Sequence, residues 1–143
     1  MKSLDVEIAI AAPPDRVWSI VRDVDQWPSW TPSVTSVERL DSGPLAVGSR
    51  VRIRQPKFPP AVWRVETLSD ADRSFTWVSS APGLRVTGHH SVKPAASGSI
   101  AKLGIEFDGL FGPLWARATR ALTEQYVNME AQGLKARSEA GAG

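Results

Sequence analysis

The two histidines of the chain, His89 and His90, are its most evident candidates for acid–base chemistry. They are adjacent, and neighbouring residues of an extended segment point to opposite sides. His90 shares its parity with the apolar residues of the same segment, Leu84, Val86 and Val92. We therefore expect His90 to face inward and to form a hydrogen bond with a ligand. General acid–base catalysis is the weaker hypothesis, because no carboxylate stands close by in the sequence.

The other reactive side chains exclude several kinds of chemistry. The chain contains no cysteine, which removes disulfides, zinc–thiolate sites and thiol nucleophiles. The two histidines point to opposite sides and cannot share a metal ion, so we predict neither a metal nor another cofactor. Glu106 and Asp108 alternate with Ile105 and Phe107, which places both carboxylates outward and disfavours a catalytic pair.

Six tryptophans are candidates either for the core or for the wall of a cavity that accepts flat ligands. Packing in the core is the favoured role for any single one. Trp63 and Trp77 lie on successive segments and share their parity with apolar neighbours, so both could face inward. Together with Trp115 or Phe111 they would form one aromatic wall.

Polar anchors are predicted from the carboxy-terminal third of the chain, at Gln125 and Tyr126. A few polar groups in a mostly apolar pocket usually orient its ligand. The alternative is structural, with Gln125 bonded to backbone or water and Tyr126 at the domain edge. Phe58, in the segment Lys57–Pro60 between two predicted strands, is a candidate lid residue, or one semi-buried aromatic in a plain surface loop.

The elements that would position these residues follow from hydrophobic periodicity. Residues 4–11 alternate as a half-buried strand does, and Pro13 and Pro14 then end the strand and begin a short helix. That helix reaches about residue 23, and residues 27–32 form a second brief helical turn. Six alternating segments separated by turn residues predict an antiparallel meander, at about 33–41, 48–55, 61–69, 73–80, 84–93 and 99–108.

A long amphipathic helix is predicted from about residue 113 to 138, because apolar residues recur there at spacings of three and four. Its inward side comprises Leu114, Ala118, Ala121, Leu122, Gln125 and Met129. Its other sides carry Arg117, Arg120, Glu124 and Glu130. Residues 1–138 are therefore expected to form a single domain, with a frayed tail over 139–143.

Charge and hydropathy point to no charged partner. The net charge is +2, and the densest basic feature is Arg50, Arg52 and Arg54, which Arg64 could join on one outer sheet face. We interpret this face as solvated and expect no nucleic-acid partner. No apolar run is as long as the roughly 20 residues of a membrane span. The expectation is a cytoplasmic monomer or homodimer without a membrane span.

Four local motifs, in this order, resemble a known family: Pro14-Asp15-Arg16-Val17-Trp18, Trp27-Pro28-Ser29-Trp30, Ser97-Gly98-Ser99 and Gly109-Leu110-Phe111-Gly112. With the predicted order β-α-α-β6-α, the chain resembles the SRPBCC or Bet v 1-like (START-like) superfamily, in its bacterial polyketide cyclase/dehydrase-like branch. The resemblance implies an α+β helix-grip fold. In this fold a curved seven-stranded antiparallel sheet wraps round the long carboxy-terminal helix and leaves an internal cavity.

The resemblance and the residue patterns together predict the lining of that cavity: Trp30, Phe58, Trp63, Trp77, Val86, His90, Phe107, Phe111, Leu114, Trp115, Ala118, Leu122, Gln125 and Met129. The first functional hypothesis is binding of a hydrophobic or aromatic small molecule, lipid-like or polyketide-like. The alternative is an enzyme of the polyketide cyclase or dehydratase type that acts in the same cavity. The third is a protein-interaction module of the Hsp90-activator kind, which an exposed apolar patch and a collapsed pocket would distinguish.

Overall fold

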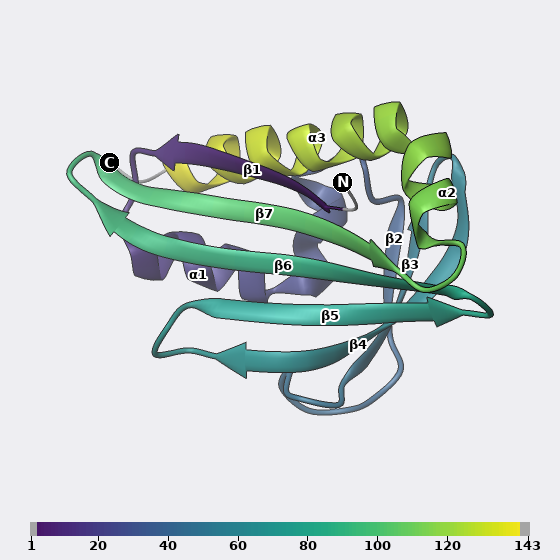
Figure 1. The fold of residues 1–143 in the computed structure, drawn as a ribbon. Helices are drawn as coiled ribbons and strands as arrows, with labels where there is room; N and C mark the ends of the chain where they lie inside the picture. Colours follow the sequence, from purple (N-terminus) through teal and green to yellow (C-terminus); the bar gives the residue numbers. More distant parts are fainter. Residues whose placement is uncertain (1–2, 141–143) are drawn as a thin grey trace.

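A seven-stranded antiparallel sheet forms most of the computed structural model, which describes residues 3–140 (Figure 1). Its strands lie in the order β1-β7-β6-β5-β4-β3-β2. Their bounds are β1 Ser3–Ile10, β2 Ser36–Arg39, β3 Arg50–Gln55, β4 Phe58–Ser69, β5 Ser74–Ala81, β6 Leu84–Ala95 and β7 Gly98–Asp108. The predicted curved sheet, with six consecutive strands after the first helices, is confirmed.

The first strand, β1, lies at one edge of the sheet and pairs with the last strand, β7. Residues of β1 pair with β7 along their whole length, from Ser3 opposite Glu106 to Ile10 opposite Ser99. The Ser99 hydroxyl also donates a hydrogen bond to the carbonyl of Ala12, at 2.6 Å. The two ends of the domain are therefore held together by a pairing between residues far apart in the sequence.

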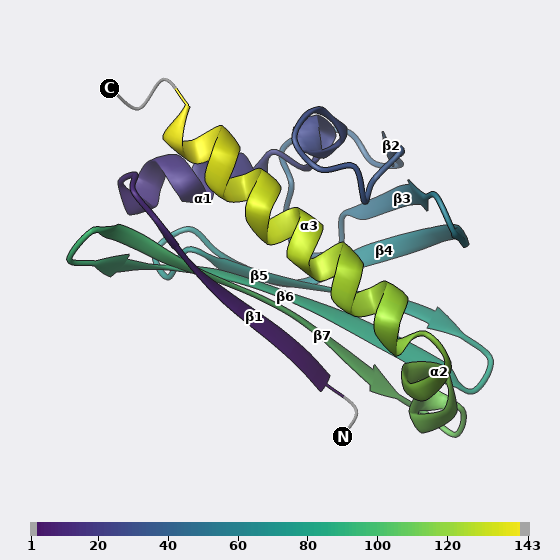
Figure 2. The ribbon, with the colours of Figure 1, turned by 90° about the horizontal axis from the view of Figure 1, so that it is seen from above.

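The helices occupy one face of the sheet. They are α1 Pro14–Arg22, the 3₁₀ helix η1 Val24–Ser29, α2 Gly112–Ala118 and α3 Arg120–Glu139. Figure 2 shows α3 running diagonally across this face, with α1 near its carboxyl end and α2 before its amino end. The main contacts of α3 with other elements are with β1, β7 and α1. None of the helices in residues 3–140 is long and apolar enough to cross a bilayer.

The core lies at the α1 end of the molecule. Val17, Trp18 and Val21 of α1 are buried there against Phe75 of the sheet and Leu134 of α3. Leu134 belongs to the last turns of α3, so the carboxyl end of that helix is the part that is packed into the core. The other end of the sheet is left without this filling.

The prediction of a single helix over residues 113–138 is wrong, because the helix is interrupted at Thr119 and divided into α2 and α3. This residue leaves the helical region, with φ −107° and ψ 7°. Its hydroxyl donates to the carbonyl of Trp115 at 2.8 Å. Such a bond from a threonine back to the preceding turn bends a helix. The helix also continues to Glu139, whose carboxylate accepts the Ala11 amide at 2.8 Å.

Smaller corrections concern element ends. The second helical turn covers Val24–Ser29 instead of 27–32. Strand β4 begins at Phe58, so the predicted loop Lys57–Pro60 is mostly strand. Residues 139–143 were expected to fray; Glu139 is helical, and residues 141–143 lie outside the described part of the chain.

Candidate functional site

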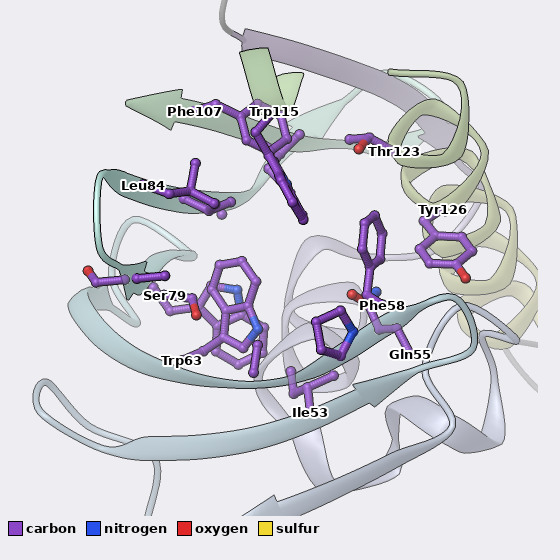
Figure 3. Close-up of a pocket in the computed structure, with 18 of the residues that line it drawn as sticks. Ile53, Gln55, Phe58, Trp63, Ser79, Leu84, Phe107, Trp115, Thr123 and Tyr126 are labelled. Atoms are coloured by element: carbon purple, nitrogen blue, oxygen red, sulfur yellow. The ribbon is translucent and has the colours of Figure 1, made fainter. Parts of the chain in front are cut away.

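A cavity of about 1010 Å³ lies between the sheet and the helices α2 and α3 (Figure 3). Strands β3 to β7 form its floor and walls, η1 contributes Trp27, and α2 and α3 form its cover. The main core reaches α3 at Leu134, and a smaller cluster packs Val127 and Ala131 of α3 against Leu103 of β7. Towards α2, side chains of the helix and the sheet face each other across unfilled space.

One wall of the cavity is aromatic. The rings of Trp63 and Trp77 lie 5.7 Å apart between centroids, and Trp27 lies 5.2 Å from Trp77. The Trp27 indole donates to the Val21 carbonyl at 3.0 Å, which fixes this ring in place. The predicted pairing of Trp63 with Trp77 is therefore found.

A second aromatic group covers the opposite side. Trp115 of α2 has Phe58 as its aromatic neighbour, at 6.4 Å between ring centroids. Phe58 also meets Tyr126 edge-on at 5.6 Å. Figure 3 shows Trp115 reaching into the cavity from the side opposite Trp63. The predicted wall is thus divided into two faces, with space for a flat molecule between them.

His90 faces inward and lines the cavity, as expected. Its ring stacks on Phe75 at 4.2 Å with an angle of 8° between the planes. Its Nδ1 lies 3.4 Å from the Phe75 carbonyl, which can accept a hydrogen bond from that nitrogen. Burial lowers the pKa of His90 to about 3. The imidazole is therefore uncharged near neutral pH. With its proton on Nδ1, facing the Phe75 carbonyl, the lone pair of Nε2 can accept a hydrogen bond.

Glu130 also lines the cavity, although the sequence pattern placed it on an outer side of the helix. That prediction is wrong. Burial raises its pKa to about 8, since the charged carboxylate loses its hydration in this environment. None of the ion pairs in residues 3–140 includes Glu130. Near neutral pH its carboxyl group is mostly protonated and can donate a hydrogen bond.

Tyr126 is the buried polar anchor of α3. Its hydroxyl accepts a hydrogen bond from the Lys57 amide at 3.1 Å, which ties the helix to the turn between β3 and β4. Accepting this bond leaves the hydroxyl proton free to be donated to another group. The structural and the ligand-binding roles considered for Tyr126 are therefore compatible.

Ten of the predicted lining residues border the cavity: Phe58, Trp63, Trp77, Val86, His90, Phe107, Phe111, Leu114, Trp115 and Ala118. Gln125 does not, because its side chain is exposed. Trp30, Leu122 and Met129 are half-buried and also lie outside the lining. Of the two alanines expected to leave room inside, Ala118 lies at the edge and Ala121 is exposed.

The break at Thr119 explains the errors on the helix. Successive residues of an α-helix are rotated by about 100° around its axis. The pattern of inward-facing positions in α2 therefore predicts the wrong face when it is extended past the interruption at Thr119 into α3. In α3 the inward stripe is Thr123, Val127 and Glu130, with Tyr126 beside it. The sequence did contain this signal, since these positions and Leu134 recur at spacings of three and four.

The mouth of the cavity is apolar and exposed. Phe111, Leu114 and Trp115 line it from α2 and the loop before it, and Leu110 beside them is 82% exposed. The Phe111 amide donates to the Gly83 carbonyl at 2.8 Å, which joins this loop to the β5–β6 turn. Three exposed apolar side chains thus line the cavity on the α2 side, with Leu110 beside them, and we refer to this side as the mouth.

Comparison with known proteins agrees with this geometry. The model of the family described as "Polyketide cyclase / dehydrase and lipid transport" matches residues 1–139. The chain belongs to this family. A relative of the polyketide cyclase family, a putative polyketide cyclase of Streptomyces halstedii, is 37% identical over 73 residues, 51% of this chain. The chain spans 55% of that relative's length.

Solved structures show the same fold at low identity. The Zhui aromatase/cyclase of Streptomyces sp. R1128 has a TM-score of 0.79 and 18% identity, with 96% of this chain and 93% of that one covered. A protein of Thermus thermophilus has a TM-score of 0.78 and 21% identity over 99% of both chains. The major latex-like protein 151 of Panax ginseng has a TM-score of 0.73 and 12% identity, covering 95% and 96%. These similarities show that the protein has the helix-grip fold.

Proposed function

We propose that this protein binds a hydrophobic or aromatic small molecule in the cavity between the sheet and α3. The observation that carries the proposal is the cavity itself, about 1010 Å³ of mostly apolar space with aromatic rings on two sides. Pockets for small molecules usually have volumes of about 300–1,000 Å³ and a few polar groups that orient the ligand. Here His90, Tyr126 and Glu130 provide those groups.

The test is native mass spectrometry of protein purified without detergent, followed by denaturing extraction of any molecule that came with it. We expect a reproducible lipophilic adduct. A variant that fills the cavity, Ala61→Trp, should lose it, because Ala61 is part of the lining. The control is Lys102→Trp, at an exposed position of β7 outside the lining.

Binding of apolar dyes then extends the test to protein that is purified empty. The wild type and Lys102→Trp should bind a neutral polycyclic dye with equal affinity, and Ala61→Trp should bind it at least about tenfold more weakly, having lost most of the buried contact. Equal dye binding by a folded Ala61→Trp variant and the wild type would show that the cavity is not the binding site.

A second function, cyclisation or dehydration of a polyketide, is favoured by one observation: a carboxyl group, that of Glu130, lines the cavity, and burial raises its pKa to about 8. In an intramolecular aldol step a carbon loses a proton to a base, attacks a carbonyl carbon and forms a C–C bond. The carbonyl oxygen takes up a proton and becomes a hydroxyl. This hydroxyl later leaves as water together with a hydrogen from the neighbouring carbon, and a carbon–carbon double bond forms. Glu130 would donate the proton to that oxygen, and the cavity would hold the chain folded.

The experiment for this second function measures the products that form from a poly-β-ketone thioester with and without the protein. An enzyme should change the product distribution, and Glu130→Gln should slow product formation by about 10²-fold or more, as loss of a general acid does. Glu124→Gln on the exposed side of α3 is the matched control. Product distributions identical to the protein-free reaction would leave binding alone.

The third hypothesis, a protein-interaction module, is disfavoured because it requires a cavity that side chains fill. The cavity is open, although the exposed apolar mouth fits an interaction site as well. Our proposal also includes a cytoplasmic location, a monomeric or homodimeric state and no nucleic-acid partner. Sedimentation or size-exclusion analysis across concentrations tests the oligomeric part directly.

A further inference from the structure

The cavity contains no fixed positive charge to receive an anion. Among the lining residues, which all belong to the described part of the chain, the side chains that titrate are His90, Tyr126 and Glu130. His90 is neutral for the reasons given above, and no lysine or arginine is part of the lining. The cations adjacent in sequence to lining residues are Arg52, which is half-buried and paired with Glu38, and others with exposed side chains: Arg54, Lys57, Arg64, Arg85, Lys102 and Arg117.

The polar groups of the cavity suit a neutral acceptor. Tyr126 has a hydroxyl proton to donate, because its oxygen already accepts the Lys57 amide. Glu130 lies one turn further along the same side of α3 and carries a carboxyl that can donate as well. A carbonyl or hydroxyl oxygen that reached either group would receive a hydrogen bond without bringing a charge into apolar surroundings.

A carboxylate would be received poorly in the same place. Burying an ion without a partner of opposite charge costs far more than burying a hydrogen-bonded neutral group. Glu130 could share its proton with an incoming carboxylate, but the pair would still hold one negative charge with no cation in the lining. If Glu130 were ionised, the two negative charges would repel each other.

From this arrangement we propose that the cavity selects uncharged ligands with a carbonyl or hydroxyl oxygen, bound by Glu130 and Tyr126, and rejects ligands whose buried end is a carboxylate. This rests on the proposed binding function and adds to it the ligand class. It separates neutral ketones, phenols and alcohols from free fatty acids and aromatic acids of the same size. The tryptophans of the cavity provide the fluorescence signal with which the distinction can be measured.

The test uses three anthracenes of similar shape: 2-acetylanthracene, anthracene-2-carboxylate and 2-methylanthracene. Their binding is followed near neutral pH by quenching of tryptophan emission. We expect the ketone to bind at least about tenfold more tightly than the carboxylate, because only the carboxylate brings an unpaired charge. The ketone should also bind more tightly than the methyl compound, which offers no oxygen.

Variants at position 130 assign the preference to its carboxyl group. Glu130→Gln keeps a hydrogen-bond donor and should keep the ketone within a few-fold of the wild type. Glu130→Leu has none, so the advantage of the ketone over the methyl compound should fall. Glu124→Gln, exposed on the same helix, should change nothing. Circular dichroism checks that each variant is folded.

The outcomes separate this inference from the binding function. If the carboxylate binds as tightly as the ketone, the selection for uncharged ligands is wrong while the cavity remains a binding site. If the ketone has no advantage over the methyl compound in the wild type, the role of Glu130 and Tyr126 is wrong. If none of the three compounds binds, the proposed binding function itself fails, and the inference with it.

Discussion

At the scale of single residues, burial shifts two pKa values of the cavity in opposite directions. The pKa of Glu130 rises to about 8 from its ordinary 4.5, and that of His90 falls to about 3 from 6.5. Burial disfavours the charged form in both cases, so both groups are neutral over a wide range around neutral pH. The cavity can therefore offer a hydrogen-bond donor, Glu130, and a hydrogen-bond acceptor, His90, without holding a net charge.

The raised pKa of Glu130 predicts how stability depends on pH. Between pH 4.5 and 8 the folded protein holds the Glu130 proton more tightly than the unfolded chain does. The free energy of unfolding therefore falls as pH rises, by at most about 1.4 kcal/mol per pH unit. Below pH 6.5, His90 has the opposite effect, because its lowered pKa makes stability fall as pH falls. The contribution of Glu130 is thus clearest between pH 6.5 and 8.

Glu130→Gln removes this titration. We measure the free energy of unfolding with urea. Between pH 6.5 and 8, the difference between Glu130→Gln and the wild type should change in favour of the variant by about 1 kcal/mol per pH unit. Glu124→Gln serves as the control at an exposed position of the same helix. Parallel pH profiles for the wild type and Glu130→Gln would mean that Glu130 is hydrated in the folded protein.

At the scale of elements, the position of α3 depends on how its carboxyl end is fastened. Arg16 of α1 donates to the carbonyls of Ser138 at 2.7 Å and Ala140 at 2.6 Å. These are carbonyls that a helix end leaves without partners, and a cation there also matches the helix dipole. Gly133 lies so close to the Trp30 carbonyl that a side chain would not fit. Both contacts hold α3 at the α1 end and leave its other end over the cavity.

Replacing Arg16 by methionine keeps much of the apolar stem and removes the donors. We expect this change to lower the free energy of unfolding by about 1–3 kcal/mol, because hydrogen bonds from a charged group to partly buried carbonyls are lost. Chemical denaturation measures the effect. Arg120→Met, at an exposed position at the start of α3, should cost much less. An equal loss in the two variants would argue against a specific fastening by Arg16.

At the scale of the whole molecule, stability is distributed unevenly along its length. The end that holds α1 has the packed core, whereas the end that holds α2 has the cavity and an exposed apolar mouth. Only Gly112 of α2 is buried, and the helix is seven residues long. Regions with few buried contacts open locally at low free-energy cost.

Hydrogen exchange should make this asymmetry visible. We expect the amides of α2 to exchange faster than those of the last turns of α3 and of the paired strands β6 and β7. A ligand that fills the cavity should slow exchange in α2, since it would pack against Trp115 and Leu114. Protection of α2 equal to that of α3 in the empty protein would show that the mouth is rigid.

Local signals in the amino-acid sequence predict the order of the elements and the architecture. Alternation of polar and apolar residues, proline and glycine at the turns, and the change to helical spacing after residue 110 are local signals, and each element follows from its own residues. The inward side of His90 followed in the same way, because a strand has only two faces and one of them is marked by Val86 and Val92.

Which side of the last helix faces the cavity depends on contacts between elements, and these are seen in the folded molecule alone. The side chains of a strand alternate between two faces, whereas those of a helix point in all directions around its axis. Which of them face inward depends on what the helix packs against and on where it begins. The bend at Thr119 and the fastening at Arg16 set that orientation, and both involve contacts that no periodic pattern encodes. For that reason Gln125 points to solvent, and Glu130, placed outside by the pattern, stands in the cavity.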